Sequence, residues 1–140
     1  MNSTLTILLV DDECAIRTLV RDCLEHAGYT VLVAADGVEG VNIFKQHQSD
    51  IALLITDVMM PNMNGLALAD RGLELESRLP VLFISGDALN TDRGYGCVAK
   101  PFTSAGLVGR VRHVFGTTRR RTDNKQQPRP PDNQENQSCL

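Results

Sequence analysis

Aromatic side chains and long apolar segments are scarce in this sequence. Phe, Trp and Tyr make up 4% of its 140 residues, against 42% for all hydrophobic residues. One domain of ordinary size therefore needs an aliphatic core, which suits helices layered on a sheet. No apolar run approaches the roughly 18 residues of a membrane span, and the first ten residues lack the pattern of a secretory leader. We expect a cytoplasmic protein without a membrane partner.

Two kinds of ligand motif are missing as well. The four cysteines form no C-x-x-C pair and have no histidine at metal-binding spacing, so we expect neither a zinc site nor a disulfide framework. There is no glycine-rich phosphate loop, because the first apolar run is followed by acid at Asp11. This argues against a nucleotide or flavin phosphate in the first turn.

The formal net charge of -3 is divided unevenly along the chain. Residues 1–116 carry nine Lys or Arg against fourteen Asp or Glu, whereas residues 117–140 carry five against three and contain no Val, Ile or Phe. Such a tail cannot bury enough apolar surface to offset the entropy lost on ordering. We therefore predict a domain over 1–116 and a disordered polar tail over 117–140.

Apolar patterns in the first part of the chain alternate between strand and helix periods. A parallel α/β sheet with helices on both faces follows, because crossovers between parallel strands are right-handed. We expect strands at 4–10, 30–34, 51–56, 80–85 and 97–99. Helices are expected from Ile16 to a stop at Gly28, from Asp36 through Phe44, through Leu66–Leu73, and after a cap at Thr103 through Phe115.

Two of the expected strands end directly on acidic residues. Asp11 and Asp12 follow the first strand, and Asp57 follows the third. Because the carboxyl ends of parallel strands meet at one edge, these carboxylates should lie together. At about 4 Å and an effective dielectric near 20, each pair repels by roughly 4 kcal/mol, so protons are retained or a cation lies among them. Mg²⁺ is the simplest such cation.

Two further polar residues belong to the same edge. Ser85 ends the fourth strand, and Lys100 follows the fifth, immediately before Pro101. Taken singly, each residue has an ordinary interpretation: the Asp pair as a helix cap, Asp57 as a turn residue, Lys100 as part of a loop, and Ser85 as a strand-end hydroxyl. Their convergence at one edge favours a functional site.

Four segments in this order resemble the receiver domain of two-component response regulators: Ile7–Glu13, Thr56–Pro61 with Gly65, Ile84–Gly86, and Ala99–Phe102. The resemblance covers residues 5 to 115. It implies a flavodoxin-like, doubly wound sheet of five parallel strands in the order 2-1-3-4-5.

The resemblance also implies a function. Asp57 would accept a phosphoryl group from a phosphohistidine on a sensor histidine kinase or a histidine phosphotransfer protein, and thereby switch contacts with an unknown downstream protein. Lys100 would be the second positive partner of that group, and Ser85 would donate a hydrogen bond to it. Such a chain is a signalling domain and not a turnover enzyme. After Phe115 we see no room for a helix-turn-helix, so we expect a stand-alone receiver without a DNA-binding domain.

The same resemblance assigns a metal site. Mg²⁺ would be bound by Asp12, Asp57 and the Met59 backbone carbonyl, with Asp11 acting partly through water.

Two features depart from the family pattern. Cys97 stands where an aromatic residue is usual, three positions before the lysine, and Tyr95 is a candidate substitute. The segment from Gly86 to Ala99 is also short and rich in glycine, so we expect a shortened fourth helix, a stub or a loop. Receivers of hybrid sensor kinases are similar in this respect.

Two alternatives stay open at this point. One is a receiver-like interaction module that works without phosphorylation. The other is an aspartyl-phosphate phosphatase of the haloacid dehalogenase type, which would need a D-x-D motif after the first strand, where this chain has adjacent Asp11 and Asp12.

Overall fold

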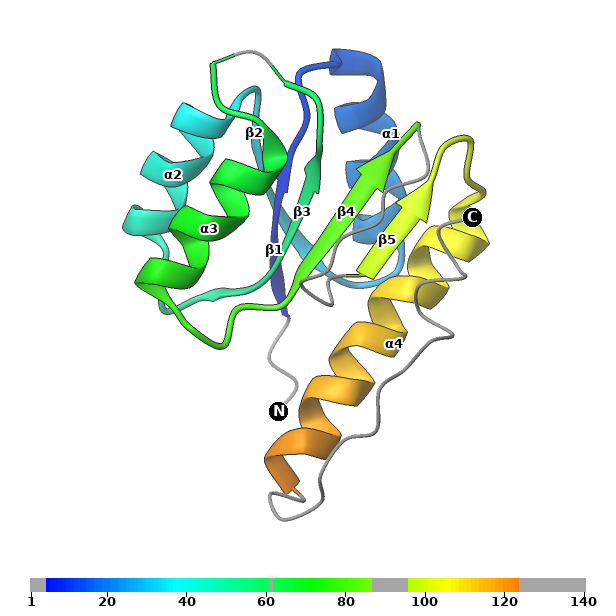
Figure 1. The fold of residues 1–140 in the computed structure, drawn as a ribbon. Coiled ribbons are helices and arrows are strands. Elements are labelled where there is room, and N and C mark those ends of the chain that lie inside the picture. The colour runs from blue at the N-terminus through cyan, green and yellow to red at the C-terminus, as the bar shows by residue number, and fades with distance from the viewer. Residues whose placement is uncertain (1–4, 61, 87–95, 124–140) are drawn as a thin grey trace.

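A single parallel sheet organises the molecule. The computed structural model describes residues 5–60, 62–86 and 96–123, and its strand order is β2-β1-β3-β4-β5, which confirms the predicted topology (Figure 1). The strands are β1 (Thr6–Val10), β2 (Thr30–Ala34), β3 (Ile51–Asp57), β4 (Val81–Ser85) and β5 (Gly96–Ala99). Every neighbouring pair is parallel, so all five carboxyl ends lie at the same edge.

Helices cover both faces of this sheet (Figure 1). Helices α2 (Gly37–Gln46) and α3 (Gly65–Leu75) pack on one face, and α1 (Cys14–His26) and α4 (Ser104–Asp123) pack on the other. Sheet residues alternate between the two layers, so that Leu8 faces α2 and α3 whereas Ile7 faces α1 and α4. The fold is therefore doubly wound, as predicted.

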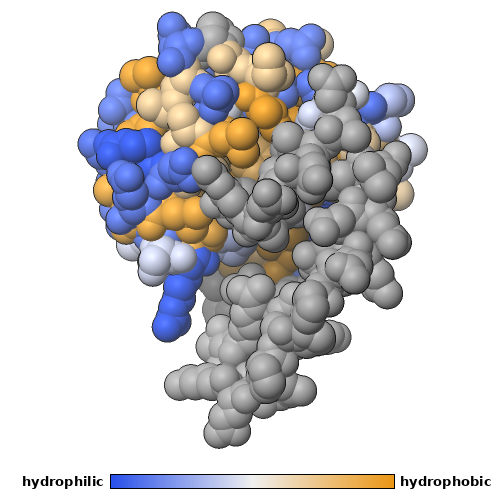
Figure 2. All heavy atoms as spheres, viewed as in Figure 1, coloured by the Kyte–Doolittle hydropathy of each residue, from blue (hydrophilic) through white to orange (hydrophobic). Residues whose placement is uncertain are grey.

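The core is aliphatic, with few aromatic rings. Phe83 is fully buried in β4 and Phe44 nearly so in α2, and the rest of the buried set is mainly Leu, Ile, Val and Ala. Seen from the same side as in Figure 1, the surface has hydrophobic residues lying between areas of hydrophilic ones (Figure 2). Within the described residues, no helix is long and apolar enough to cross a membrane.

Side chains cap three of the helices. Asp36 Oδ1 accepts from the Glu39 amide at 2.8 Å at the start of α2, and Asn64 Oδ1 accepts from the Ala67 amide at 2.9 Å at the start of α3. Thr103 Oγ1 accepts from the Gly106 amide at 2.9 Å, which confirms the predicted cap of α4. Helix α1 has Glu13 at its N-cap and no capping side-chain hydrogen bond.

The last helix differs from the expectation at its end. Helix α4 continues to Asp123, so residues 117–123, which we assigned to a disordered tail, are helical. The remainder of that tail, residues 124–140, lies outside the described residues. The predicted stub or loop in place of a fourth helix, and Tyr95 with it, also lie largely outside them, because residues 87–95 are not described.

Candidate functional site

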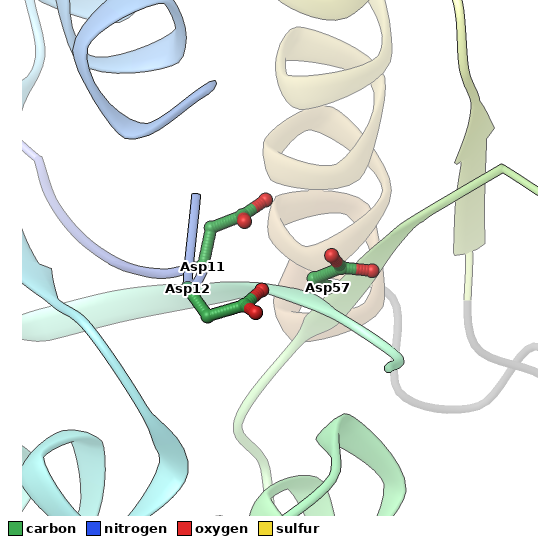
Figure 3. Close-up of side chains that lie close together, drawn as sticks. All are labelled: Asp11, Asp12 and Asp57. Atoms are coloured by element: carbon green, nitrogen blue, oxygen red, sulfur yellow. The ribbon is translucent and has the colours of Figure 1, made fainter. Parts of the chain in front are cut away.

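Three aspartates converge at the carboxyl edge of the sheet. Strands β1 and β3 are neighbours in register, with Val10 opposite Thr56, so the residues that follow them meet. Asp11, Asp12 and Asp57 each bring a carboxylate oxygen within 4.8 Å of the others (Figure 3). Asp11 and Asp57 are buried and Asp12 is exposed. The convergence predicted from the two apolar runs is confirmed.

Asp11 is held by hydrogen bonds at three of its four polar atoms. Its amide donates to the Ala34 carbonyl at 3.2 Å, and its Oδ1 accepts from the Glu13 amide at 2.9 Å. Its carbonyl accepts from Arg17 Nη1 at 2.7 Å. The fourth atom, Oδ2, is buried and has no hydrogen-bond partner. A buried carboxylate oxygen without a hydrogen-bond partner is unfavourable, and a nearby positive charge stabilises it.

The pKa of Asp11 reflects this environment. Burial is the largest effect, and the net result raises the pKa of Asp11 from 3.8 to about 6. The negative charges of Asp57 and Asp12 act in the same direction, whereas the Glu13 amide and the Lys100 ammonium oppose it. The raised pKa of Asp11 thus reflects, in addition to burial, the repulsion between carboxylates that the sequence predicted for this edge.

Lys100 supplies the positive charge of the site. Its Nζ lies 3.3 Å from Asp57 Oδ2, 3.5 Å from Glu13 Oε1 and 3.9 Å from Asp11 Oδ2. Burial alone would lower the pKa of Lys100, but the carboxylates of Asp57 and Asp11 raise it above its ordinary value. The lysine is therefore charged at neutral pH and bridges the acids from both strands.

The backbone places Lys100 and Ser85 next to each other. The Lys100 amide donates to the Ser85 carbonyl at 2.8 Å, which continues the pairing of β4 and β5 beyond Ala99. The Lys100–Pro101 peptide bond is cis. Ser85 is buried at the end of β4, the strand that pairs with β3. The sheet thus brings both residues to the edge that carries Asp57.

The loop after Asp57 is also fixed at the site. The Met59 amide lies 3.4 Å from Asp57 Oδ1, in hydrogen-bond contact, while its side chain is exposed. The Thr56 hydroxyl donates to the Asp57 carbonyl at 2.8 Å. The Gly65 amide donates to the Val58 carbonyl at 2.8 Å, and a Cβ at Gly65 would collide with the Asp57 carbonyl oxygen. The start of α3 is therefore pressed against the end of β3.

A hard divalent cation fits this set of residues. The four carboxylates of the site outnumber its two positive groups, Lys100 and Arg17, and one of the buried carboxylate oxygens has no hydrogen-bond partner. Carboxylate oxygens are the ligands that Mg²⁺ prefers. The acid cluster can hold such an ion with Asp11, Asp12 and Asp57.

Sequence reasoning missed three residues that shape the site. Arg17 contacts the Asp11 carbonyl, Glu13 contacts Lys100, and Thr56 contacts the Asp57 carbonyl. Glu13 follows the Asp pair directly, so its proximity was a usable signal. The contacts of Arg17 and Thr56 are made to backbone atoms, for which the residue pattern has no marker.

Comparison with known proteins gives the same family from three directions. Residues 7–112 match the family model of the response regulator receiver domain. The chain is 37% identical over 116 residues to the transcriptional regulatory protein CseB of Streptomyces avermitilis, covering 78% of this chain and 48% of that protein. The chain thus spans about half the length of the curated transcriptional regulators that it matches.

Solved structures agree in fold. The receiver domain of the hybrid histidine kinase CckA is 37% identical, with a TM-score of 0.70, over 78% of this chain and 97% of that one. The CheX-CheY-BeF₃-Mg²⁺ complex from Borrelia burgdorferi contains a chain that is 26% identical, with a TM-score of 0.72, over 79% of this chain and 89% of that one. From its fold, its acidic edge and these matches, the chain belongs to the response regulator receiver domain family of two-component systems.

Proposed function

We propose that this chain is a phosphoacceptor receiver and that Asp57 is the residue that carries the phosphoryl group. The observation that supports this most directly is the ammonium of Lys100 at 3.3 Å from Asp57 Oδ2, in a cluster that also contains the carboxylates of Asp11 and Asp12. The donor would be a phosphohistidine on a sensor histidine kinase or a histidine phosphotransfer protein.

The transfer itself asks little covalent chemistry of the protein. A carboxylate oxygen of Asp57 attacks phosphorus, the phosphorus–nitrogen bond of the donor breaks, and the imidazole leaves in line. The protein's task is to orient the acceptor oxygen and to offset charge on the equatorial oxygens. Asp57 is suited to the first task because the Met59 amide and Lys100 each contact one of its oxygens.

Mg²⁺ would be held by Asp11, Asp12, Asp57 and the Met59 backbone carbonyl. When bound, the ion supplies charge neutralisation to the transferring group. The similar Borrelia burgdorferi complex contains BeF₃ and Mg²⁺, which supports this choice of cation. The Oδ2 of Asp11, buried without a hydrogen-bond partner, supports it independently.

Lys100 and Ser85 complete the proposed site. The ammonium already lies within 4 Å of Asp57, Asp11 and Glu13, so it needs little movement to contact a phosphoryl oxygen on Asp57. Ser85 is proposed to donate a hydrogen bond to that group, because it ends the strand next to β3.

We propose that the output is a change in binding to another protein, and that the chain is a signalling domain without turnover. A complete two-state switch from 1:99 to 99:1 requires about 5.5 kcal/mol, whereas one charge-assisted hydrogen bond contributes about 1.5 to 3. Cys97, buried in β5, has no ring to move between exposed and buried positions. The partner therefore supplies much of the difference between the two states.

The decisive experiment is phosphorylation of the purified chain by acetyl phosphate in Mg²⁺. Intact mass should show one added phosphoryl group that is stable to acid and labile to base. Asp57→Ala should abolish the adduct, whereas Asp50→Ala, immediately before the start of the same strand, should retain it.

Either of two results would refute the proposal. One is a wild-type chain that takes up no phosphoryl group, which would favour the phosphorylation-independent interaction module. The other is an adduct that persists in Asp57→Ala. The family match speaks against the haloacid dehalogenase alternative.

A further inference from the structure

We propose that Arg17 is a positioning residue of the cation site, acting through the backbone of Asp11. This inference rests on the proposed function, because it assigns a role toward the same divalent ion. Arg17 lies in the first turn of α1, and its Nη1 donates to the Asp11 carbonyl at 2.7 Å.

The Asp11 carbonyl needs this donor because of where it lies. Asp11 is fully buried and follows β1, so its carbonyl is shielded from water. Helix α1 starts too late to satisfy it, since the Arg17 amide donates to the Glu13 carbonyl, two residues further on. A buried carbonyl without a donor is costly, and the guanidinium of Arg17 reaches back to meet that need.

The consequence for the site is geometric. With its amide, carbonyl and Oδ1 each hydrogen-bonded, the Asp11 peptide has one fixed orientation. Only Oδ2 stays without a hydrogen-bond partner, and the Asp11 carboxylate lies in one cluster with those of Asp12 and Asp57 (Figure 3). The same peptide carries Asp12 as its next residue. Arg17 thus fixes the turn that presents two of the three carboxylates.

The charge and the geometry of Arg17 have opposite effects on a bound cation. Its positive charge repels the ion, while its hydrogen bond fixes the ligands that bind it. Loss of the charge alone would tighten binding, and loss of the position would weaken it. Mutation of residues that orient metal ligands through hydrogen bonds commonly changes metal affinity by about 10- to 100-fold. We infer that position outweighs charge here, because the bond is short and its acceptor is buried.

The test is a calorimetric Mg²⁺ titration of the whole chain and three variants. Arg17→Lys keeps the charge but loses the planar fork, and Arg17→Gln loses both. Arg21→Gln, one turn further along α1, is the matched control for the loss of charge. We expect both Arg17 variants to bind Mg²⁺ about 10-fold more weakly, and Arg21→Gln to bind it at least as tightly as the wild type does.

Two further measurements separate positioning from a general structural role. A residue that only supports the fold would lower the unfolding temperature in EDTA without moving the Mg²⁺ dissociation constant. In phosphorylation by acetyl phosphate, the Arg17 variants should need more Mg²⁺ for half-maximal rate but approach the wild-type rate at saturation. In an Asp11→Asn background, Arg17→Lys should lose most of its effect on Mg²⁺ affinity.

The outcomes are distinguishable. If wild type binds Mg²⁺ and both Arg17 variants bind it equally or more tightly, Arg17 is not a positioning residue and the proposed function stands. If wild type binds no Mg²⁺, the metal part of the proposed function and this inference fall together. Should Arg17→Gln fold too poorly to titrate, Arg17→Lys decides the question, because it keeps the charge and most of the stem.

Discussion

At the scale of single residues, burial of the Asp11 carboxyl lowers the free energy of unfolding at neutral pH. Its pKa is raised from 3.8 to about 6, chiefly by burial. The folded chain therefore holds a proton between those pH values that the unfolded chain has released. This bound proton stabilises the folded chain fully below pH 4, and the stabilisation is lost as the pH rises through 6. At pH 7 without divalent cations, the folded chain is therefore about 3 kcal/mol less stable than it would be if the pKa of Asp11 were not raised.

Asp11→Asn should remove this penalty. We expect the variant to unfold at higher urea than wild type at pH 7 in EDTA, by about 1 to 3 kcal/mol, and the difference to shrink toward pH 4. Urea unfolding at both pH values provides the measurement. An equal difference at pH 4 and pH 7 would contradict an origin in the ionisation of Asp11.

The residues of the site divide by how far they could be predicted from the sequence. Asp11, Asp12 and Asp57 each follow an apolar run, and parallel strands bring such positions together whatever the loops do. Arg17 differs, because its partner is a backbone carbonyl exposed by the way β1 gives way to α1. No pattern of residue types encodes that geometry, so Arg17 required the structure.

At the scale of elements, the start of α3 packs tightly against the end of β3. Gly65→Ala would place a Cβ against the Asp57 carbonyl oxygen, and the three atoms nearest to that Cβ all belong to the backbone of Asp57 and Val58. We expect a loss of about 1 to 3 kcal/mol of stability and slower phosphorylation, because Asp57 must move.

Gly109 of α4 is the matched control for that substitution, since it is also helical but a Cβ there meets nothing within 4 Å. Gly109→Ala should stabilise the chain by about 0.5 to 1 kcal/mol through helix propensity, with phosphorylation unchanged. Thermal unfolding of the two variants measures both effects. If Gly65→Ala matched Gly109→Ala in sign, the packing of α3 on β3 would not be tight.

Helix starts were easier to predict than the last helix end. Thr103 has a capping side chain next to an apolar helical pattern, and the structure confirms it. The end of α4 is different, because the apolar period stops at Phe115 while the helix runs to Asp123. Arginine has high helix propensity, so Arg119–Arg121 can extend a helix without leaving an apolar signal.

At the scale of the whole molecule, Val114 and Phe115 are the last residues whose packing against the core the structure describes. The ring centroid of Phe115 lies 5.5 Å from that of Tyr29, and this contact joins the middle of α4 to the turn after α1. A chain that ends after Gly116 should keep the unfolding temperature of the full chain. One that ends after His113 should lose about 2 kcal/mol, because Val114 and Phe115 both pack against the core.

Thermal unfolding of the two truncated chains compares these expectations, and Mg²⁺ addition shows whether the site is intact in each. A large loss of stability on removal of residues 117–140 would mean that the domain extends beyond 116.

The Oδ2 of Asp11, which is buried without a hydrogen-bond partner, also affects how the stability of the folded chain depends on cations. If the acid cluster binds Mg²⁺ as proposed, the folded chain offers the ion a set of ligands that the unfolded chain lacks, and mass action couples folding to ion supply. Above the dissociation constant, each tenfold rise in free Mg²⁺ adds about 1.4 kcal/mol to the free energy of unfolding. If the site binds Mg²⁺ as proposed, the free energy of unfolding thereby depends on magnesium supply, in addition to the phosphoryl signal that the domain is proposed to receive.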